Sequence, residues 1–305
     1  MRTSLDCLPC FMKQARTVGK LAGADLTVQR QLCDEAGRFI ADVNTDLSPP
    51  ENAVALYAAF AEILKTDDPF AQVKRESNEL ALSLREAIRA RIEEAGEPLR
   101  AAVQAAVGGN IIDYAAQHVF DAAQTMQDCF AQDFVIDDYP ALQEAISRGR
   151  TVLYLYDNCG EIVFDALLIE QLQQLGCQVT AAVRGFPIIN DATLADVSFC
   201  GLDSLCPVIS NGTACPGTPL DQCSAEFCAH FQAADLVISK GMGNFETLSE
   251  VPAPIFFLFT VKCAEVAKHL TQRQGLAPGK LTGSGEMVLV QQKKSDLLSN
   301  STKEL

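Results

Sequence analysis

Through the first half of the chain, hydrophobic residues recur every three or four positions, which is the spacing of amphipathic helices. Pro49 and Pro50 end one such pattern and open the next, because proline stops a helix yet fits a first turn. We therefore expect an all-helical unit over residues 1–147. The expected helices fall within 7–22, 27–43, 49–65, 68–95 and 97–117.

From about residue 148 the pattern changes to short apolar runs that alternate with helical stretches of about 10 to 15 residues. The runs include TVLYLYD, CQVTAAVRG, DLVISK and PIFFLFTV. Such alternation predicts a mostly parallel sheet covered by helices on both faces. The fold class expected is α/β, with a Rossmann-like three-layer catalytic core over 148–290, the helical domain before it, and a polar tail over 291–305.

Polar residues follow the predicted strands directly. In parallel sheets the carboxyl ends of the strands share one edge, and ligands bind there. We therefore expect these side chains to meet at one site. They are Asp157, Asn158, Gly160 and Glu161 after the first strand; Arg184, Asn190 and Asp191 after the second; Lys240, Asn244 and Glu246 after the next; and Lys262 after the last.

The chemistry of this set favours a metal and a phosphoryl group. Carboxylate oxygens of Asp157 and Asp191 with the amide oxygen of Asn158 suit Mg²⁺ or Mn²⁺. Lys240 and Lys262 would supply positive charge to a phosphoryl group. Each fragment alone has a structural interpretation: an Asp-Asn pair is commonly a turn former and helix cap, and Lys262 could be a solvated residue at a helix start. A cation is poorly placed at the positive end of a helix dipole, however, and this mismatch indicates an anion near Lys262.

Composition narrows the partners. The formal net charge is -15 and the sequence pI is near 4.6, so the chain lacks a broad cationic surface for nucleic acid or an anionic membrane. The start of the chain has no secretory apolar core, and no run approaches the roughly 20 apolar residues of a membrane span, so we expect a cytoplasmic protein. Twelve cysteines then indicate thiols rather than disulfides. Cys7 and Cys10 read as half of a metal site, a redox pair or small apolar residues opening a helix.

Several ordered motifs carry a family resemblance: CLPC at the start, GGNIID at 108–113, DNCGEIVFD, RGFPIINDAT, SKGMGNFETL and FLFTVKC. Together they resemble the DUF89 family of metal-dependent phosphatases, also called damage-control phosphatases, in its prokaryotic branch with an amino-terminal CxxC. The resemblance runs from Cys7 to about Val290. It implies a helical region packed on a Rossmann-like core.

The resemblance also implies roles at the site. Asp157, Asn158 and Asp191 would hold the divalent metal. Asn110 and Asp113 would contact phosphate or metal-bound water, although both also read as helix-capping groups after Gly108 and Gly109. The residues placed around the substrate are Glu161, Arg184, Asn190, Lys240, Asn244 and Lys262, of which we expect Glu161, Lys240 and Lys262 to act in catalysis with Asp157.

The sequence therefore predicts a phosphatase for small phosphomonoesters, such as sugar phosphates or related damaged metabolites. Its cofactor would be Mg²⁺, Mn²⁺, Co²⁺ or Ni²⁺, and either water or Asp157 would attack the phosphorus. The alternatives are a metal-dependent sensor of phosphorylated metabolites without turnover, and a carboxyl methyltransferase that uses S-adenosylmethionine. The only partner expected is the small phosphorylated metabolite.

Overall fold

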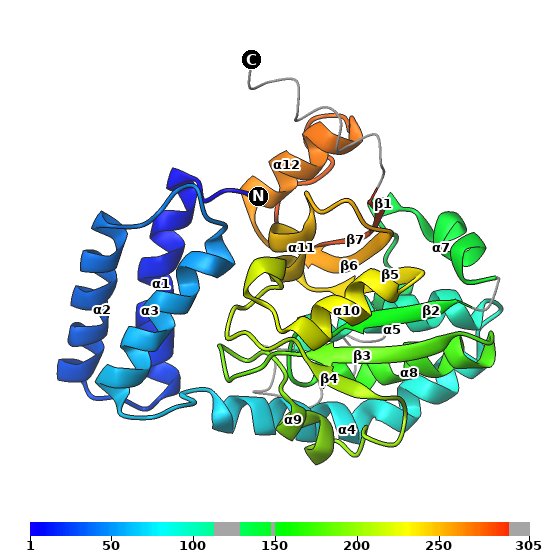
Figure 1. The fold of residues 1–305 in the computed structure, drawn as a ribbon, viewed down its shortest axis with the longest axis horizontal. Coiled ribbons are helices and arrows are strands. Elements are labelled where there is room, and N and C mark those ends of the chain that lie inside the picture. Colours follow the sequence, from blue (N-terminus) through cyan, green and yellow to red (C-terminus); the bar gives the residue numbers. More distant parts are fainter. Residues whose placement is uncertain (113–128, 148–149, 293–305) are drawn as a thin grey trace.

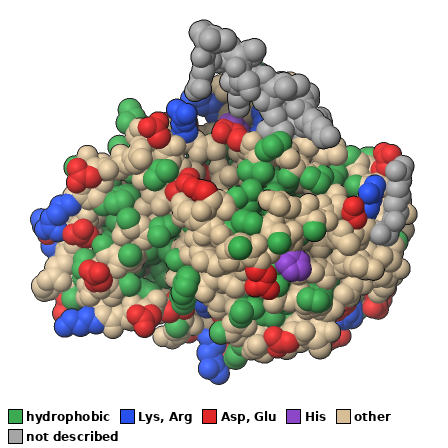
Figure 2. Space-filling model, viewed as in Figure 1, with side chains coloured by type: hydrophobic (Ala, Val, Ile, Leu, Met, Phe, Trp, Pro, Cys, Tyr) green, Lys and Arg blue, Asp and Glu red, His purple; other side chains and the backbone are tan. Residues whose placement is uncertain are grey.

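A seven-stranded sheet with helices on both faces forms the centre of the protein (Figure 1). The computed structural model describes residues 1–112, 129–147 and 150–292, and for 110–112 it describes the backbone alone. Among these residues, no helix combines the length and the apolar character needed to cross a bilayer. On the face in Figure 2, acidic and basic side chains are interspersed, and the basic ones form no broad patch.

The sheet is mostly parallel, as the sequence predicts. The strand order is β1-β7-β6-β5-β2-β3-β4, and every neighbouring pair is parallel except β6 and β7. The chain runs from β2 outward to β4 and then returns to place β5 on the other side of β2, which makes the carboxyl ends of β2 and β5 a switch point of the topology. The strands are β1 (Ile136–Asp137), β2 (Thr151–Leu155), β3 (Gln178–Val183), β4 (Val208–Ser210), β5 (Leu236–Lys240), β6 (Ile255–Val261) and β7 (Glu286–Gln291).

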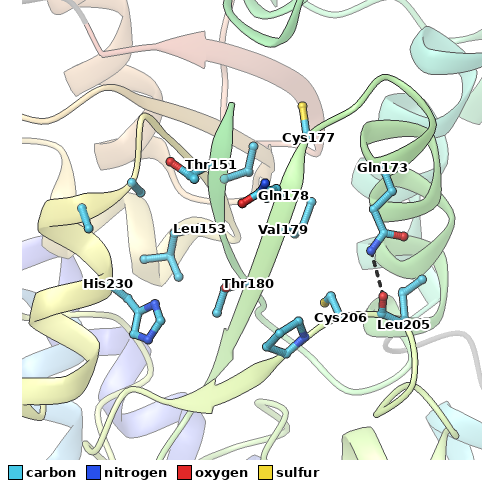
Figure 3. A pocket seen from close by; sticks show the side chains of 14 residues that line it. Thr151, Leu153, Gln173, Cys177, Gln178, Val179, Thr180, Leu205, Cys206 and His230 are labelled. Atoms are coloured by element: carbon cyan, nitrogen blue, oxygen red, sulfur yellow. Dashed lines mark hydrogen bonds between the residues drawn. The ribbon is translucent and has the colours of Figure 1, made fainter. Parts of the chain in front are cut away.

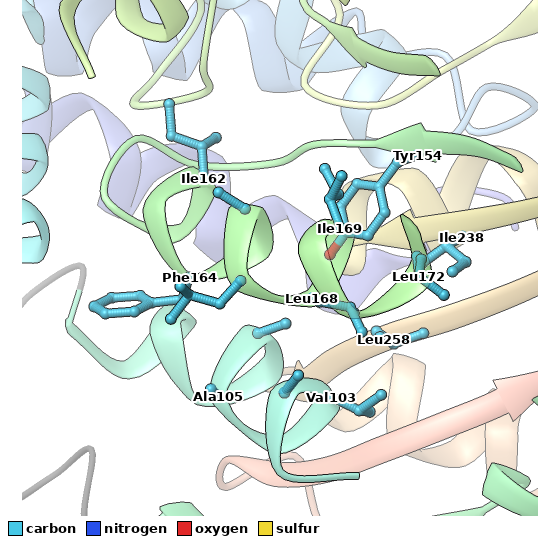
Figure 4. Packing of buried hydrophobic residues seen from close by; sticks show 14 of the residues in the cluster. Val103, Ala105, Tyr154, Ile162, Phe164, Leu168, Ile169, Leu172, Ile238 and Leu258 are labelled. Atoms are coloured by element: carbon cyan, nitrogen blue, oxygen red, sulfur yellow. The ribbon is translucent and has the colours of Figure 1, made fainter. Parts of the chain in front are cut away.

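Successive residues of each strand supply two different cores, because side chains alternate between the faces of a sheet. On β2, Val152 and Tyr154 belong to one core, while Leu153 and Leu155 belong to the other. The first core packs on α4 (Ala71–Glu94), α5 (Pro98–Ile112), α7 (Tyr139–Ile146), α8 (Glu161–Gln174) and α9 (Leu194–Phe199). The second packs on α10 (Ala225–Ala233), α11 (Met242–Leu248) and α12 (Ala264–Gln274). Figure 4 shows Val103 and Ala105 of α5 close to Phe164 and Leu168 of α8.

Three amino-terminal helices have a separate core. They are α1 (Leu8–Leu21), α2 (Leu26–Ala41) and α3 (Pro49–Leu64). Ser48 caps α3 through a reciprocal capping box with Glu51, and Pro49 and Pro50 fill its first turn as predicted. Ile188, from the loop after β3, is buried in this same core, so these helices brace that loop. Two short 3₁₀ helices, η1 (Leu5–Cys7) and η2 (Leu220–Gln222), complete the described elements.

Helices α4 and α5 lie on the sheet rather than with α1–α3. Six of the residues 101–107 on α5 are buried and apolar, and a helix that is apolar on most sides needs cover on most sides. Strand β1 also precedes residue 148 and yet pairs with β7. These contacts cross the domain division expected at residue 147, and that division stays a prediction.

Candidate active site

The turn after β2 carries the first group of predicted site residues. We call residues 157–160 the DN turn. Gly160 has φ +81°, which favours glycine, and its N–H donates to the Asn78 side-chain oxygen at 2.6 Å. Helix α8 then begins at Glu161. The turn is therefore fixed from one side by a strand and from the other by α4.

The loop after β3 lies against the DN turn through backbone contacts. We call residues 185–192 the ND loop. The Ala192 N–H donates to the Asp157 carbonyl at 2.8 Å, the Cys159 N–H donates to the Asn190 carbonyl at 2.9 Å, and Asn158 and Asp191 form an isolated antiparallel bridge. These bonds bring Asp157, Asn158 and Asp191 together, although up to 34 residues separate them in sequence.

Arg184 holds the two aspartates. Its Nε donates to Asp191 at 2.6 Å and its Nη2 to Asp157 at 3.3 Å, while Nη1 donates to Thr218 and Asn244. The guanidinium is buried, so its role in this structure is to orient carboxylates rather than to face the cavity. Burial opposes its charge, but Asp191 and Asp157 outweigh that effect and raise the pKa of Arg184.

The two aspartates are buried acids in a crowded acidic site. Burial, followed by the charges of Asp191 and Glu161, raises the pKa of Asp157 well above its ordinary value. Burial also raises the pKa of Asp191, against the opposing effect of Arg184. The charged form of both carboxyls is therefore disfavoured despite the neighbouring Arg184, and a divalent cation would stabilise it.

Lys240 occupies a second charged cluster beneath the DN turn. Its Nζ donates to the Ala106 carbonyl at 2.7 Å, to Asp165 at 2.7 Å and to Glu161 at 3.3 Å. Burial lowers the pKa of Lys240, yet Asp165 and Glu161 more than offset this and raise it. All three protons of the ammonium thus have an acceptor, and Lys240 does not line the cavity. The sequence had predicted instead that Lys240 contacts the phosphate.

Glu161 connects this cluster to the DN turn. Asn158 Nδ2 donates to Glu161 at 2.7 Å and to Asp157 at 2.9 Å, so the Asn158 amide is oriented by two carboxylates. Asp157 is also confined by Gly241, whose φ is +80°. A Cβ at Gly241 would lie 2.0 Å from Asp157 Oδ2, so only glycine fits there.

A cavity of about 220 Å³ opens on the strand-end side of these groups. Four polar residues of the DN turn and ND loop line it, Asp157, Asn158, Asn190 and Asp191, and the exposed Lys262 adds a positive charge. The remaining lining comes from α1 and α3, from the ND loop, from the segment after β4, from α11 and from β6: Gln14, Pro49, Pro50, Ala53, Ile189, Pro216, Met242, Gly243, Glu246 and Thr260.

The donor set fits a divalent ion that keeps several waters. The Asn158 side-chain nitrogen donates to two carboxylates, which leaves its Oδ1 available to a cation. Arg184 binds Oδ2 of Asp191, which leaves Oδ1 of Asp191 available. Neither of these two oxygens accepts a hydrogen bond from the described residues. Two carboxylates and an amide suit Mg²⁺ or Mn²⁺. Within the described ranges, no group of three or more His, Cys, Asp or Glu side chains is arranged to hold a metal ion. The proposed donor set therefore needs the Asn158 amide as its third ligand.

A larger cavity, of about 440 Å³, lies at the opposite edge of the sheet, where β2 and β3 begin. Figure 3 shows Thr151, Gln178, Thr180 and His230 around it. Among the residues that the structure describes, its lining includes no Asp, Glu, Lys or Arg. This cavity is larger than the one at the DN turn, but its chemistry does not suit a charged phosphate.

Comparisons with known proteins show the family to which the chain belongs. The family model described as damage-control phosphatase ARMT1-like domain matches residues 3–277. The chain belongs to this family. The damage-control phosphatase PH1575 of Pyrococcus horikoshii is 35% identical over 279 residues, which cover 90% of this chain and 96% of that protein. A damage-control phosphatase of Archaeoglobus fulgidus is 32% identical, with 88% and 96% covered.

A solved structure shows the same fold. The crystal structure of the DUF89 protein of P. horikoshii superimposes with a TM-score of 0.86 at 33% identity, covering 96% of this chain and all of that one. Membership in the damage-control phosphatase family confirms the resemblance found in the motifs, and the names of these relatives support a phosphatase role.

The structure groups most of the predicted site residues. Asp157, Asn158, Asn190, Asp191 and Lys262 line the cavity, while Glu161, Arg184, Lys240 and Asn244 lie buried behind it. Asn110 is in α5, but its side chain lies outside the described residues, as does all of Asp113. Gly109 nevertheless brings α5 against α8, since a Cβ there would meet Phe164 at 2.9 Å.

The sequence of this member of the damage-control phosphatase family did not point to four residues that contribute to the site. They are Asn78, Asp165, Thr218 and Gln14. Asp165 did leave a signal, because it is a single acid within the otherwise apolar helical stretch IVFDALL. The others lie in segments whose local pattern gives no sign of the site.

Proposed function

We propose that this protein is a divalent-metal-dependent phosphatase of small phosphomonoesters, such as sugar phosphates or related damaged metabolites. The observation that carries the proposal is the convergence of Asp157, Asn158 and Asp191 on one cavity with Lys262. Oxygen donors for a cation and a positive side chain for phosphate then share a single small volume.

The roles follow from the contacts. Asp157, Asn158 and Asp191 would hold Mg²⁺, Mn²⁺, Co²⁺ or Ni²⁺, which when bound would polarise the phosphoryl group and promote attack by water. Lys262 would balance negative charge on the transferring group, and Asn190 would contact it. Arg184 and Asn244 would keep the carboxylates in place, and Lys240 would do the same for Glu161.

Asp157 is the candidate for a second route, in which its carboxylate attacks the phosphorus and water later hydrolyses the aspartyl phosphate. The close approach of Gly241 restricts the Asp157 side chain, which suits either role. Trapping a covalent phosphoryl-enzyme in a rapid acid quench distinguishes this route from direct attack by water.

The experiment is a hydrolysis assay of the purified protein with p-nitrophenyl phosphate and a panel of phosphorylated metabolites. Each reaction is run with Mg²⁺, Mn²⁺, Co²⁺ or Ni²⁺, and with EDTA. Asp191→Asn is compared with Asp42→Asn, a change at an exposed aspartate on the end of α2. Chelator-sensitive turnover that only Asp191→Asn abolishes supports the proposal.

Two other results would contradict the proposal. Metal-dependent binding of a phosphorylated metabolite without turnover would favour a sensor. Heat of binding for S-adenosylmethionine, with no phosphate release, would favour a methyltransferase.

A further inference from the structure

The proposed active-site cavity has a wall that does not come from the sheet. Gln14 of α1 and Pro49, Pro50 and Ala53 of α3 form this wall. Proline and alanine side chains offer no hydrogen bonds. Gln14 is therefore the one side chain from this wall that can form a hydrogen bond with a bound molecule.

Gln14 has hydrogen-bonding capacity that the described protein does not use. Its Oε1 is buried and has no hydrogen-bond partner among the described residues. Buried polar atoms in native proteins are nearly always paired with protein, water or ligand, because an unpaired one is costly. Rotation of the amide exchanges its oxygen and its nitrogen, so it can accept from or donate to a hydroxyl group.

The phosphoryl group cannot use this wall if it is held as proposed. Asp157, Asn158, Asp191 and Lys262 lie at the ends of strands, and the cation and phosphate belong with them. The alcohol part of the substrate must then occupy what remains of the cavity, next to α1 and α3. A sugar or polyol has hydroxyl groups to offer there, whereas an aryl group has none.

We propose that Gln14 selects the leaving group, by a hydrogen bond between its amide and a hydroxyl of a sugar or polyol phosphate. This inference rests on the proposed phosphatase function and adds a specificity-determining residue to it. The residue lies outside the sheet that carries the chemistry, and it belongs to a helix with a core of its own. Selection of the alcohol is thereby separated from handling of the phosphate.

The test compares Gln14→Met with Lys13→Met. Methionine keeps the length and flexibility of glutamine but is a poor hydrogen-bonding group. Lys13 is the exposed neighbour on the same helix, so it controls for the new side chain. For each protein, kcat/KM is measured with the sugar phosphate that the wild type hydrolyses best and with p-nitrophenyl phosphate, and thermal unfolding checks the fold.

We expect Gln14→Met to lower kcat/KM for the sugar phosphate about 5- to 10-fold, the effect of one neutral hydrogen bond, and to change the aryl phosphate value less than about twofold. Lys13→Met should change neither. Gln14→Asn keeps the amide but shortens its reach, so it should show the same selective loss and serves if the methionine variant does not fold. An equal loss on both substrates, or no loss, overturns the role of Gln14. A wild type that hydrolyses neither substrate overturns the phosphatase function itself.

Discussion

Replacing Lys240 with methionine should destabilise the protein strongly, whatever its activity. The ammonium is 1% exposed and contacts Asp165, Glu161 and the Ala106 carbonyl at 2.7, 3.3 and 2.7 Å. Methionine fills similar space but leaves two buried carboxylates without a counter-charge. Breaking a buried ion pair in this way costs about 3–5 kcal/mol, so we expect a loss of that size in the free energy of unfolding at pH 8.

The loss should shrink in acid. Burial raises the pKa of Asp165 to about 6, even against the opposing effect of Lys240. The folded protein therefore takes up this proton below about pH 6, whereas the unfolded chain takes it up only near 3.8. Protonation favours the folded state in that window, and more so without Lys240, so the cost of the variant should fall by about 1–2 kcal/mol between pH 8 and pH 5.

Urea unfolding followed by far-UV circular dichroism measures both effects. Lys268→Met is the matched control, because Lys268 is 64% exposed and its contact with Glu265 is 3.7 Å, so its loss should cost under about 0.5 kcal/mol. Adding Asp165→Asn to Lys240→Met should restore part of the stability. A Lys240→Met variant within about 1 kcal/mol of the wild type at both pH values would refute this account of the cluster.

Three further changes test other parts of the structure. Gly241→Ala should lower kcat/KM about 100-fold by displacing the aspartate of the DN turn, whereas Gly279→Ala, with φ +83° and open space around its Cβ, should leave activity unchanged. Burial raises the pKa of the Glu246 carboxyl to about 7, so the wild type should lose about 3 kcal/mol of stability as pH rises from 4.5 to 7. Glu246→Gln should not show this loss, and unfolding curves of equal pH dependence for the two proteins would contradict that interpretation. Ile188→Ala should lower the free energy of unfolding by about 2–4 kcal/mol and weaken Mn²⁺ binding through the ND loop. Phe186 is 58% exposed in the same loop, so Phe186→Ala should do neither; urea unfolding measures the stability and calorimetry the Mn²⁺ binding.

The sequence predicted the meeting of Asp157 and Asp191 because a simple rule governs it. Both residues follow strands of one parallel sheet, and such strands end at a common edge. The rule gives proximity only. It could not give the Arg184 guanidinium between the two carboxylates, since that depends on side-chain directions in the folded loop.

The sequence was less informative where separate layers meet. The partners of Lys240 come from α5 and α8, and no local periodicity reports that a helix carbonyl at Ala106 reaches the end of β5. Gln14 is similar, because the pattern of α1 shows which face is apolar but not where the bundle of α1–α3 rests on the sheet domain. Long-range packing of this kind is decided by surfaces assembled from distant segments.

The central claim is that Asp157, Asn158 and Asp191 hold one divalent ion through oxygen atoms. Anomalous diffraction from crystals soaked in Mn²⁺ tests it most directly, with Asp191→Asn crystals as the comparison. The account predicts a single strong peak among these three side chains in the wild type and its loss in the variant. A wild-type map without a peak there, or with its manganese elsewhere in the molecule, would contradict it.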